Sequence, residues 1–261
     1  MSTSVILKNM LVLGFDTAAS ACSAALCRDG DTLAHRYEAM AQGQAEYLMG
    51  MINDVMEEAG KDFGDLNLLA VTTGPGSFTG IRIGLAVARG LALAGDLPCM
   101  GVTTFEAVAA GVSETERDGA TLLVAIEPKR DDIYVQAFAA GLEPLSAPQA
   151  VLPEALAAVL AGVSTPGVTG APPAKNKRGH PVAPGGRVVV AGDASQRAIA
   201  SLDGVGLEVA LSIAPVTPDA GTLAVLAAGR WSPTTPNERP RPLYLRPPDA
   251  KTPKDGGRLR P

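Results

Sequence analysis

Residues 71–95 read VTTGPGSFTGIRIGLAVARGLALAG, and the rest of the chain is organised around them. The apolar run at 66–73 predicts a buried strand. A glycine-rich turn follows at 74–80, and 79–95 has the composition of a helix. A turn of this kind before a helix N-terminus presents backbone N–H groups to an anion. The stretch therefore predicts an α/β fold with a candidate anion site where the helix begins.

The helix at 79–95 has two charged residues only, Arg82 and Arg89, which lie close together on one side at 100° per residue. A surface helix needs a broad polar face, and this one has a narrow polar strip. On another side Gly80, Gly84 and Ala88 recur every four residues, a spacing that lets a second helix approach closely. We therefore predict that its own sheet covers one side of this helix and a partner covers another.

The composition is that of a globular protein with one large domain or two small ones. The chain has 261 residues, of which 46% are hydrophobic and 19% charged, and its formal charge of −5 argues against a primary role in gripping nucleic acid. Its three cysteines have no metal-binding spacing, which indicates buried thiols in a reducing compartment. No apolar run reaches the roughly 18 residues of a membrane span, so we expect a cytoplasmic protein without membrane contact.

The hydrophobic pattern predicts a similar order of elements in the two halves of the chain. The predicted strands are 11–15, 21–27, 32–40, 66–73, 97–102, 121–126, 133–139, 187–190 and 208–211, and the predicted helices are 44–59, 79–95, 104–110, 153–160, 196–202 and 219–230. The predicted units are an extension at 1–9, an N-terminal lobe at 10–112, a C-terminal lobe at 113–248 with a flexible Gly- and Pro-rich insert at 161–187, and a disordered tail at 249–261.

A second apolar stripe accompanies the core face of the predicted helix 44–59. Ala45, Met49 and Met56 lie beside the stripe that contains Leu48 and Ile52. Methionine is common at adaptable contact surfaces, so this stripe is a candidate partner interface. The alternative is that Met49 and Met56 simply widen the core face.

Two turns are candidate phosphate or nucleotide contacts. Asp16 and Thr17 end the first strand, where a carboxylate could hold hydrated Mg²⁺ and a hydroxyl could meet a phosphate. Gly74, Gly76 and Ser77 form the turn before the helix, but the lysine of a Walker A loop is missing. The plainer alternatives are that Asp16 caps a turn and Gly76 supplies a positive φ. No histidine base stands near Ser77 in the sequence, which argues against a peptidase triad, and no metal-ligand spacing is found.

The most specific motif of the chain is GPGSFTGIRIG at 74–84, and further segments support it. These segments are 13–18, 21–26, 88–92, 101–104, 125–127, 133–134, 191–194 and 244–246. Together they resemble the TsaB (YeaZ) family over about residues 10–160 and 187–250. Gln44 replaces a histidine that is frequent in the family, Glu127-Pro128-Lys129 replaces an acidic-Ala-Arg turn, and the insert has no family counterpart.

The resemblance implies a two-lobed actin-like/Hsp70-like (RNase H-like) fold with a helix-flanked mixed sheet in each lobe. It further implies a non-catalytic scaffold, a peptidase-like homologue without a peptidase site, that acts in forming N6-threonylcarbamoyladenosine at position 37 of tRNAs that read ANN codons. The implied partners are TsaD, which carries the active site, and the ATPase TsaE, with tRNA reached only through the complex.

The helices 44–59 and 79–95 are where such a family would place its contact with TsaD. The candidate interface residues are Ala45, Met49, Met56, Gly80, Gly84, Ala88 and Leu91. We expect a homodimer when the chain is alone, because an apolar face without its partner can pair with itself. The chain is expected to require no cofactor, although ATP or ADP with Mg²⁺ could bind at or near the partner interface. The alternative function is an autonomous ATPase that uses Asp16 and the 74–80 turn.

Overall fold

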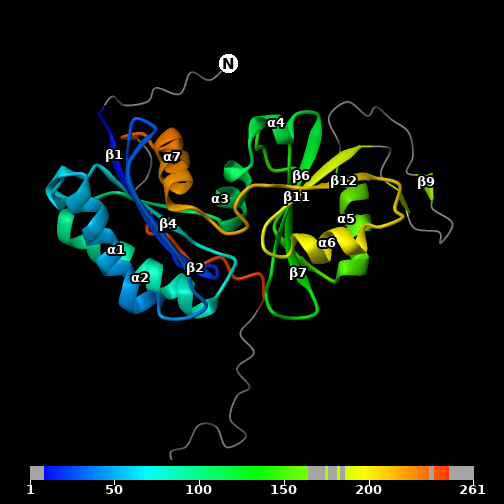
Figure 1. Ribbon diagram of the computed structural model, residues 1–261, viewed down its shortest axis with the longest axis horizontal. Coiled ribbons are helices and arrows are strands. Elements are labelled where there is room, and N and C mark those ends of the chain that lie inside the picture. Colours follow the sequence, from blue (N-terminus) through cyan, green and yellow to red (C-terminus); the bar gives the residue numbers. More distant parts are fainter. Residues whose placement is uncertain (1–8, 164–173, 176–180, 183–185, 235–237, 247–261) are drawn as a thin grey trace, which may run out of the picture.

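The chain forms two lobes, each built on one five-stranded sheet flanked by helices, as Figure 1 shows. The computed structural model describes residues 9–163, 174–175, 181–182, 186–234 and 238–246. The predicted fold class, a two-lobed α/β chain with a mixed sheet in each lobe, is confirmed.

The first sheet has the strand order β3-β2-β1-β4-β5, with β1 at its centre. β2 pairs antiparallel with both β1 and β3, whereas β4 runs parallel to β1 and β5 runs parallel to β4. Their bounds are β1 Leu11–Asp16, β2 Ala21–Arg28, β3 Asp31–Ala39, β4 Leu68–Thr72 and β5 Cys99–Val102. Because β1 is buried on both faces, its whole sequence is apolar up to Asp16.

Helices cover both faces of this sheet. One face carries α1 Gln44–Glu58 and α2 Phe78–Gly95, and the other carries α7 Ala220–Arg230. The short helix η1 Phe63–Asp65 precedes β4 in the chain. Gly14 lets α7 approach closely, since a Cβ there would lie 2.5 Å from the carbonyl oxygen of Ala220. The N-cap of α3 Thr104–Gly111 is Thr103, whose side chain forms a capping box with Glu106.

The second sheet has the strand order β12-β11-β6-β7-β8. Its strands are β6 Ala120–Ile126, β7 Ile133–Phe138, β8 Gln149–Val151, β11 Arg187–Ala191 and β12 Glu208–Leu211. The helices of this lobe are α4 Glu114–Arg117, η2 Pro153–Ala155, α5 Leu156–Ala161 and α6 Ser195–Ser201, and a small pair is formed by β9 Ala174–Lys175 and β10 Pro181–Val182. Between the lobes, α3 packs against β6 and β7.

The assignment of all of 113–248 to the second lobe is wrong at its C-terminal end. After β12 the chain returns to the first lobe, where α7 packs against β1, β2 and β4. The segment 238–246 also returns, because the backbone N–H of Leu243 donates a 2.8 Å hydrogen bond to the carbonyl oxygen of Thr73. Most of the predicted extension 1–9, most of the insert 161–187 and the whole tail 249–261 lie outside the described residues.

Among the described residues, α2 is the one helix that is long and apolar enough to cross a bilayer by length and composition alone. In the fold it packs along β4 and beside α1, with Ile81, Leu85 and Ala88 in the core of the first lobe. This position accounts for its apolar composition on the sheet side.

Candidate functional site

The turn before α2 is fixed against the loop that follows β1. The backbone N–H of Ser77 donates a 2.7 Å hydrogen bond to the carbonyl oxygen of Ala18, and the Ser77 hydroxyl caps α2 by accepting from Gly80 N–H at 3.2 Å. A Cβ at Gly76 would collide with the carbonyl oxygen of Ala18. Gly76 is therefore required because the two backbones approach closely here. Its φ is not positive, so the alternative explanation that Gly76 supplies a positive φ is wrong.

The small residues of α2 face the sheet of the chain itself. A Cβ at Gly80 would collide with the carbonyl oxygen of Thr17, and one at Gly84 would lie 2.7 Å from the Thr17 hydroxyl. Ala88 is fully buried in the core of the same lobe. The prediction that Gly80, Gly84 and Ala88 admit a partner helix is therefore wrong, because Gly80 and Gly84 lie against Thr17 at the end of β1 and Ala88 is buried in the core of its own lobe.

Asp16 is buried beneath this contact. One carboxylate oxygen accepts from Ala18 N–H at 3.1 Å and from the Thr72 hydroxyl, while the other has no hydrogen-bond partner. Burial raises the pKa of Asp16 to about 6, against the opposing effect of the Thr72 hydrogen bond. The Thr17 hydroxyl is also committed, since it donates to the carbonyl oxygen of Gly80 at 2.8 Å.

These contacts argue against direct ligand contact by Asp16 or Thr17, both of which are at most 1% exposed. Gly74 is buried as well, and its carbonyl oxygen accepts from Thr104 N–H at 2.8 Å. Of the predicted phosphate contacts, Gly76 and Ser77 alone line an open cavity.

That cavity, of about 510 Å³, lies between the lobes. The first lobe lines it with the loop 18–20 and the turn 75–78, and the second lobe lines it with the loop 126–130 and with Tyr134 and Asp193. The C-terminal segment 243–246 closes one side. The N-terminus of α2 thus opens into a space with aromatic walls and charges of both signs.

Two carboxylates on the second-lobe side of the cavity are held by the protein itself. Both carboxylate oxygens of Glu127 accept from Arg197 Nη1, at 2.7 and 2.8 Å. The Asp193 carboxylate accepts from Glu127 N–H at 2.8 Å, and burial raises the pKa of Asp193 to about 6. Neither Arg197 nor Asp132, which forms a 2.8 Å ion pair with Arg246, was singled out from the sequence for these contacts.

The two charged residues of α2 hold the C-terminal segment. The guanidinium of Arg82 stacks 3.7 Å from the Phe78 ring centroid, and its Nε donates to the Tyr244 hydroxyl at 3.2 Å. Arg89 donates to the carbonyl oxygen of Pro240 at 2.8 Å. Sequence reasoning placed both arginines on one side of the helix but missed what they bind. The sequence signal for a common binding partner was that both arginines lie on the same side of the helix.

Beside these two arginines, the exposed side of α2 also carries residues without charge. Ala86, Gly90 and Leu93 are exposed, and Leu93 is 82% exposed. On α1, Ala45 and Met49 are exposed, whereas Leu91 of α2 is half-buried. We call the exposed residues Ala45, Met49, Ala86, Gly90 and Leu93 the α1–α2 face.

Met56 does not belong to the α1–α2 face. It is 3% exposed and packs in the first-lobe core, so its assignment to the interface is wrong and the alternative that it widens the core face holds. Leu93 was not predicted as an interface residue, because the small residues that recur every four positions, on which the prediction rested, lie on the opposite side of the helix.

No group of three or more His, Cys, Asp or Glu side chains suited to a metal is present in the part of the chain that the structure describes. The three cysteines are buried free thiols, as the sequence predicts.

Comparison with known proteins gives consistent likenesses. The family described as "TsaD: tRNA N6-adenosine threonylcarbamoyltransferase" matches residues 38–163. The chain is 40% identical over 126 residues to "tRNA threonylcarbamoyladenosine biosynthesis protein TsaB" of Escherichia coli, covering 48% of this chain and 53% of that protein. The protein of the same description from Haemophilus influenzae is 30% identical over 128 residues, covering 49% and 53%.

A solved structure extends the likeness to the whole fold. YeaZ from Pseudomonas aeruginosa superposes with a TM-score of 0.69 at 24% identity, covering 90% of this chain and 100% of that one. In sequence, by contrast, the chain spans about half the length of the curated relatives it matches. The resemblance indicated by the segment 74–84 is confirmed.

Proposed function

Since the chain is a TsaB (YeaZ)-like protein, we propose that it is a non-catalytic partner subunit that pairs with a TsaD homologue to form N6-threonylcarbamoyladenosine in tRNA. In this proposal the TsaD homologue carries the active site, a TsaE homologue joins the pair, and the assembly works in the cytoplasm on position 37 of tRNAs that read ANN codons.

The observation that carries the proposal is the α1–α2 face. Leu93 and Met49 expose large apolar side chains there, and Ala86 and Gly90 leave the α2 backbone open to a second helix. The two arginines that could make α2 a solvated helix are turned to the C-terminal segment instead. An apolar face rimmed by charged residues is typical of a protein-binding surface.

The nature of the partner follows from the likeness to the transferase family. The match to that family includes all of α1 and α2. A partner with the same helices can place them against these two in a pseudo-symmetric pair. When that partner is missing, a second copy of this chain is the natural substitute, and we expect a homodimer.

The absence of catalysis by this subunit is supported by how its carboxylates are used. Asp16 has no open face, and both Thr17 and Glu127 are engaged by the protein itself. Asp16 therefore does not fit the role of a Mg²⁺ ligand at the cavity, and we derive no step through it. This also disfavours the alternative of an autonomous ATPase. We propose that ATP or ADP, where it takes part, binds at the partner interface.

The test is co-expression with the TsaD homologue, followed by size exclusion and an assay of tRNA modification. Leu93→Glu should abolish co-elution and modification, because it places a charge on the most exposed apolar side chain of the α1–α2 face. Leu152→Glu, at a leucine 48% exposed on the other lobe, is the matched control and should leave both unchanged. Co-elution of the Leu93→Glu variant with an active complex would refute the interface.

The catalytic assignment has its own test. The purified chain alone should show no transferase activity and should bind neither ATP nor ADP by calorimetry. Nucleotide hydrolysis by the isolated chain that disappears in Asp16→Ala would favour the ATPase alternative instead.

A further inference from the structure

The C-terminal segment 239–246 forms a basic strip on an acidic protein. It carries three arginines and no acidic residue, in a chain whose formal charge is −5. Arg239 and Arg241 are exposed, and neither forms an ion pair with a residue that the structure describes. Such a concentration of positive charge on one segment is the electrostatic feature expected of a polyanion site.

The segment is held in place rather than loosely attached. Arg89 binds the Pro240 carbonyl, Arg82 binds the Tyr244 hydroxyl, and Leu243 N–H binds the Thr73 carbonyl. Gly101 of the edge strand β5 makes room for it, since a Cβ there would lie 3.1 Å from the Pro240 side chain. The strip is therefore fixed along the β5 edge of the first lobe, and its arginines occupy defined positions.

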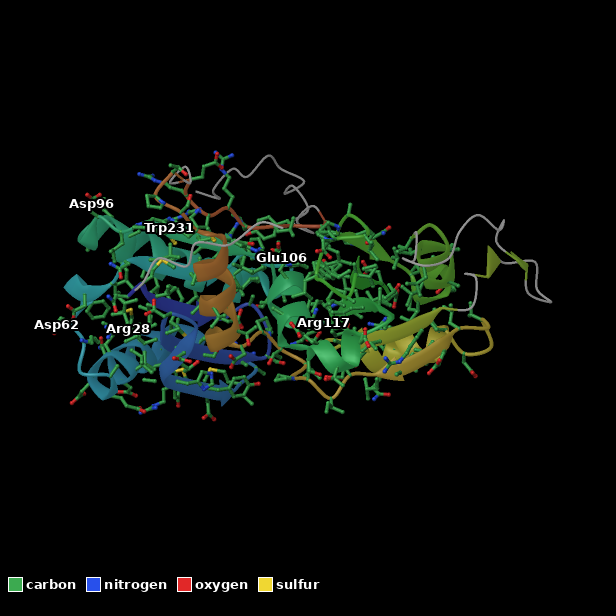
Figure 2. The ribbon with its side chains drawn as sticks, turned by 90° about the horizontal axis from the view of Figure 1, so that it is seen from above. Arg28, Asp62, Asp96, Glu106, Arg117 and Trp231 are labelled. Atoms are coloured by element: carbon green, nitrogen blue, oxygen red, sulfur yellow. The ribbon has the colours of Figure 1, made fainter. Side chains whose placement is uncertain are left out.

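Further cations and aromatic rings adjoin the strip at both ends. At one end Trp231 shares a hollow of about 460 Å³ with Arg239 and Arg241, and Figure 2 shows Trp231 on this side of the first lobe. At the other end Tyr244 and Phe78 lie against each other, with ring centroids 5.5 Å apart, and Lys129 lines the adjoining cavity. In Figure 1 the red end of the ribbon passes from the first lobe towards the second.

Acidic groups near the strip are few and mostly engaged. Glu238 lines the same hollow as Arg239. Asp132 is paired with Arg246, and Glu127 is paired with Arg197. Arg246 is therefore partly neutralised, and the strongest free positive charge belongs to Arg239 and Arg241.

We propose that this strip, centred on Arg239 and Arg241, binds the phosphate backbone of RNA directly. The proposal rests on the proposed function for the identity of that RNA as tRNA. Arginine guanidinium groups pair with phosphates in bidentate geometry, and neighbouring aromatic rings stack on unpaired bases. Eight residues span at most about 26–29 Å, a length comparable to several successive phosphates. This replaces the expectation that tRNA is reached only through the complex.

The experiment measures binding of an unmodified tRNA transcript to the full chain by fluorescence anisotropy between 50 and 200 mM NaCl. The double variant Arg239→Ser/Arg241→Ser should weaken binding by at least about tenfold and reduce the salt slope by about 1.4 to 1.8, the loss of two phosphate contacts. The control Arg36→Ser/Lys61→Ser removes the same charge away from the strip, Arg36 lying on the opposite edge strand β3, and should change neither quantity.

Three results would overturn the proposal. They are no measurable tRNA binding by the unchanged chain, equal behaviour of the two double variants, and tighter binding to phosphatidylglycerol vesicles than to tRNA. The strip variant should still co-elute with the TsaD homologue, whereas Leu93→Glu should lose co-elution and keep RNA binding. Failure of this proposal is thereby separable from failure of the proposed function.

Discussion

Asp16→Asn should change how the stability of this protein depends on pH. The Asp16 carboxylate is fully buried, and one of its oxygens has no hydrogen-bond partner. An asparagine oxygen can still accept from the Thr72 hydroxyl and from Ala18 N–H, so the local geometry is preserved. The substitution therefore removes the ionisation and leaves most of the contacts.

The sign and size follow from the pKa of Asp16, which burial raises from 3.8 to about 6. A raised pKa means that the folded state binds this proton more tightly than the unfolded state. The associated stability is fully present below pH 3.8 and is lost as the pH rises through about 6. Two pKa units correspond to about 3 kcal/mol, so charging Asp16 should cost the folded protein about that much at pH 7.

The assay is urea unfolding of both proteins at intervals from pH 4 to pH 7. The free energy of unfolding of Asp16→Asn, relative to the unchanged protein, should rise by about 2.4 kcal/mol over this range, because about 0.5 kcal/mol of the effect is already present at pH 4. The buried amide costs about 1–3 kcal/mol at every pH, so the pH-dependent rise is the informative quantity. Asp54→Asn, at an exposed position on α1, controls for the lost charge. A difference between the two proteins that stays constant within about 1 kcal/mol from pH 4 to pH 7, less than half of the expected rise, would refute the reasoning.

Three further predictions concern packing and access. Gly80→Ala should lower the free energy of unfolding by about 1–3 kcal/mol, because the added Cβ meets the Thr17 carbonyl. Gly90→Ala in the same helix has open space around the added Cβ, and it should raise the free energy of unfolding by up to about 1 kcal/mol in the same urea titration. Arg82→Ala should speed chymotryptic cleavage after Tyr244, since it removes the hydrogen bond that holds this side chain. An unchanged rate of cleavage would contradict that role. All three cysteine thiols are buried, which raises their pKa values, so none should react with Ellman's reagent at pH 8 until urea is added; rapid labelling of the folded protein would contradict the packing.

The sequence was sufficient to predict most elements and the class of fold. Local chemistry set these boundaries: Thr103 caps α3 together with Glu106, and Asp219 caps α7 through its side chain. The predicted strands and helices of the first half correspond to β1–β5 and α1–α3 with small shifts at their ends. Patterns within about ten residues contain this information, because caps and apolar periods are local.

The contacts that each helix face makes with distant parts of the chain could not be predicted in the same way. The α2 sequence shows a small-residue side and an arginine side, but it does not say which side meets the sheet. Gly84 faces Thr17 of its own lobe, and Arg89 faces Pro240, which is 151 residues distant in sequence. The prediction that α7 belongs to the second lobe was wrong for the same reason. Its packing against β1 depends on how the chain returns from the second lobe to the first. Such long-range contacts leave no periodic trace.

The structure connects the two proposals through α2. Close approach to Thr17 requires glycine on one side of this helix, and the C-terminal segment requires Arg82 and Arg89 on another. The exposed residues Ala86, Gly90 and Leu93 beside these arginines meet neither requirement, so the lack of charge on this side needs a separate cause, and the proposed partner subunit would supply it. The same arginines that leave this side apolar also hold Arg239 and Arg241 along the β5 edge. Arg89→Ala should therefore weaken RNA binding while co-elution with the TsaD homologue persists, and loss of both together would show that the two surfaces are not independent.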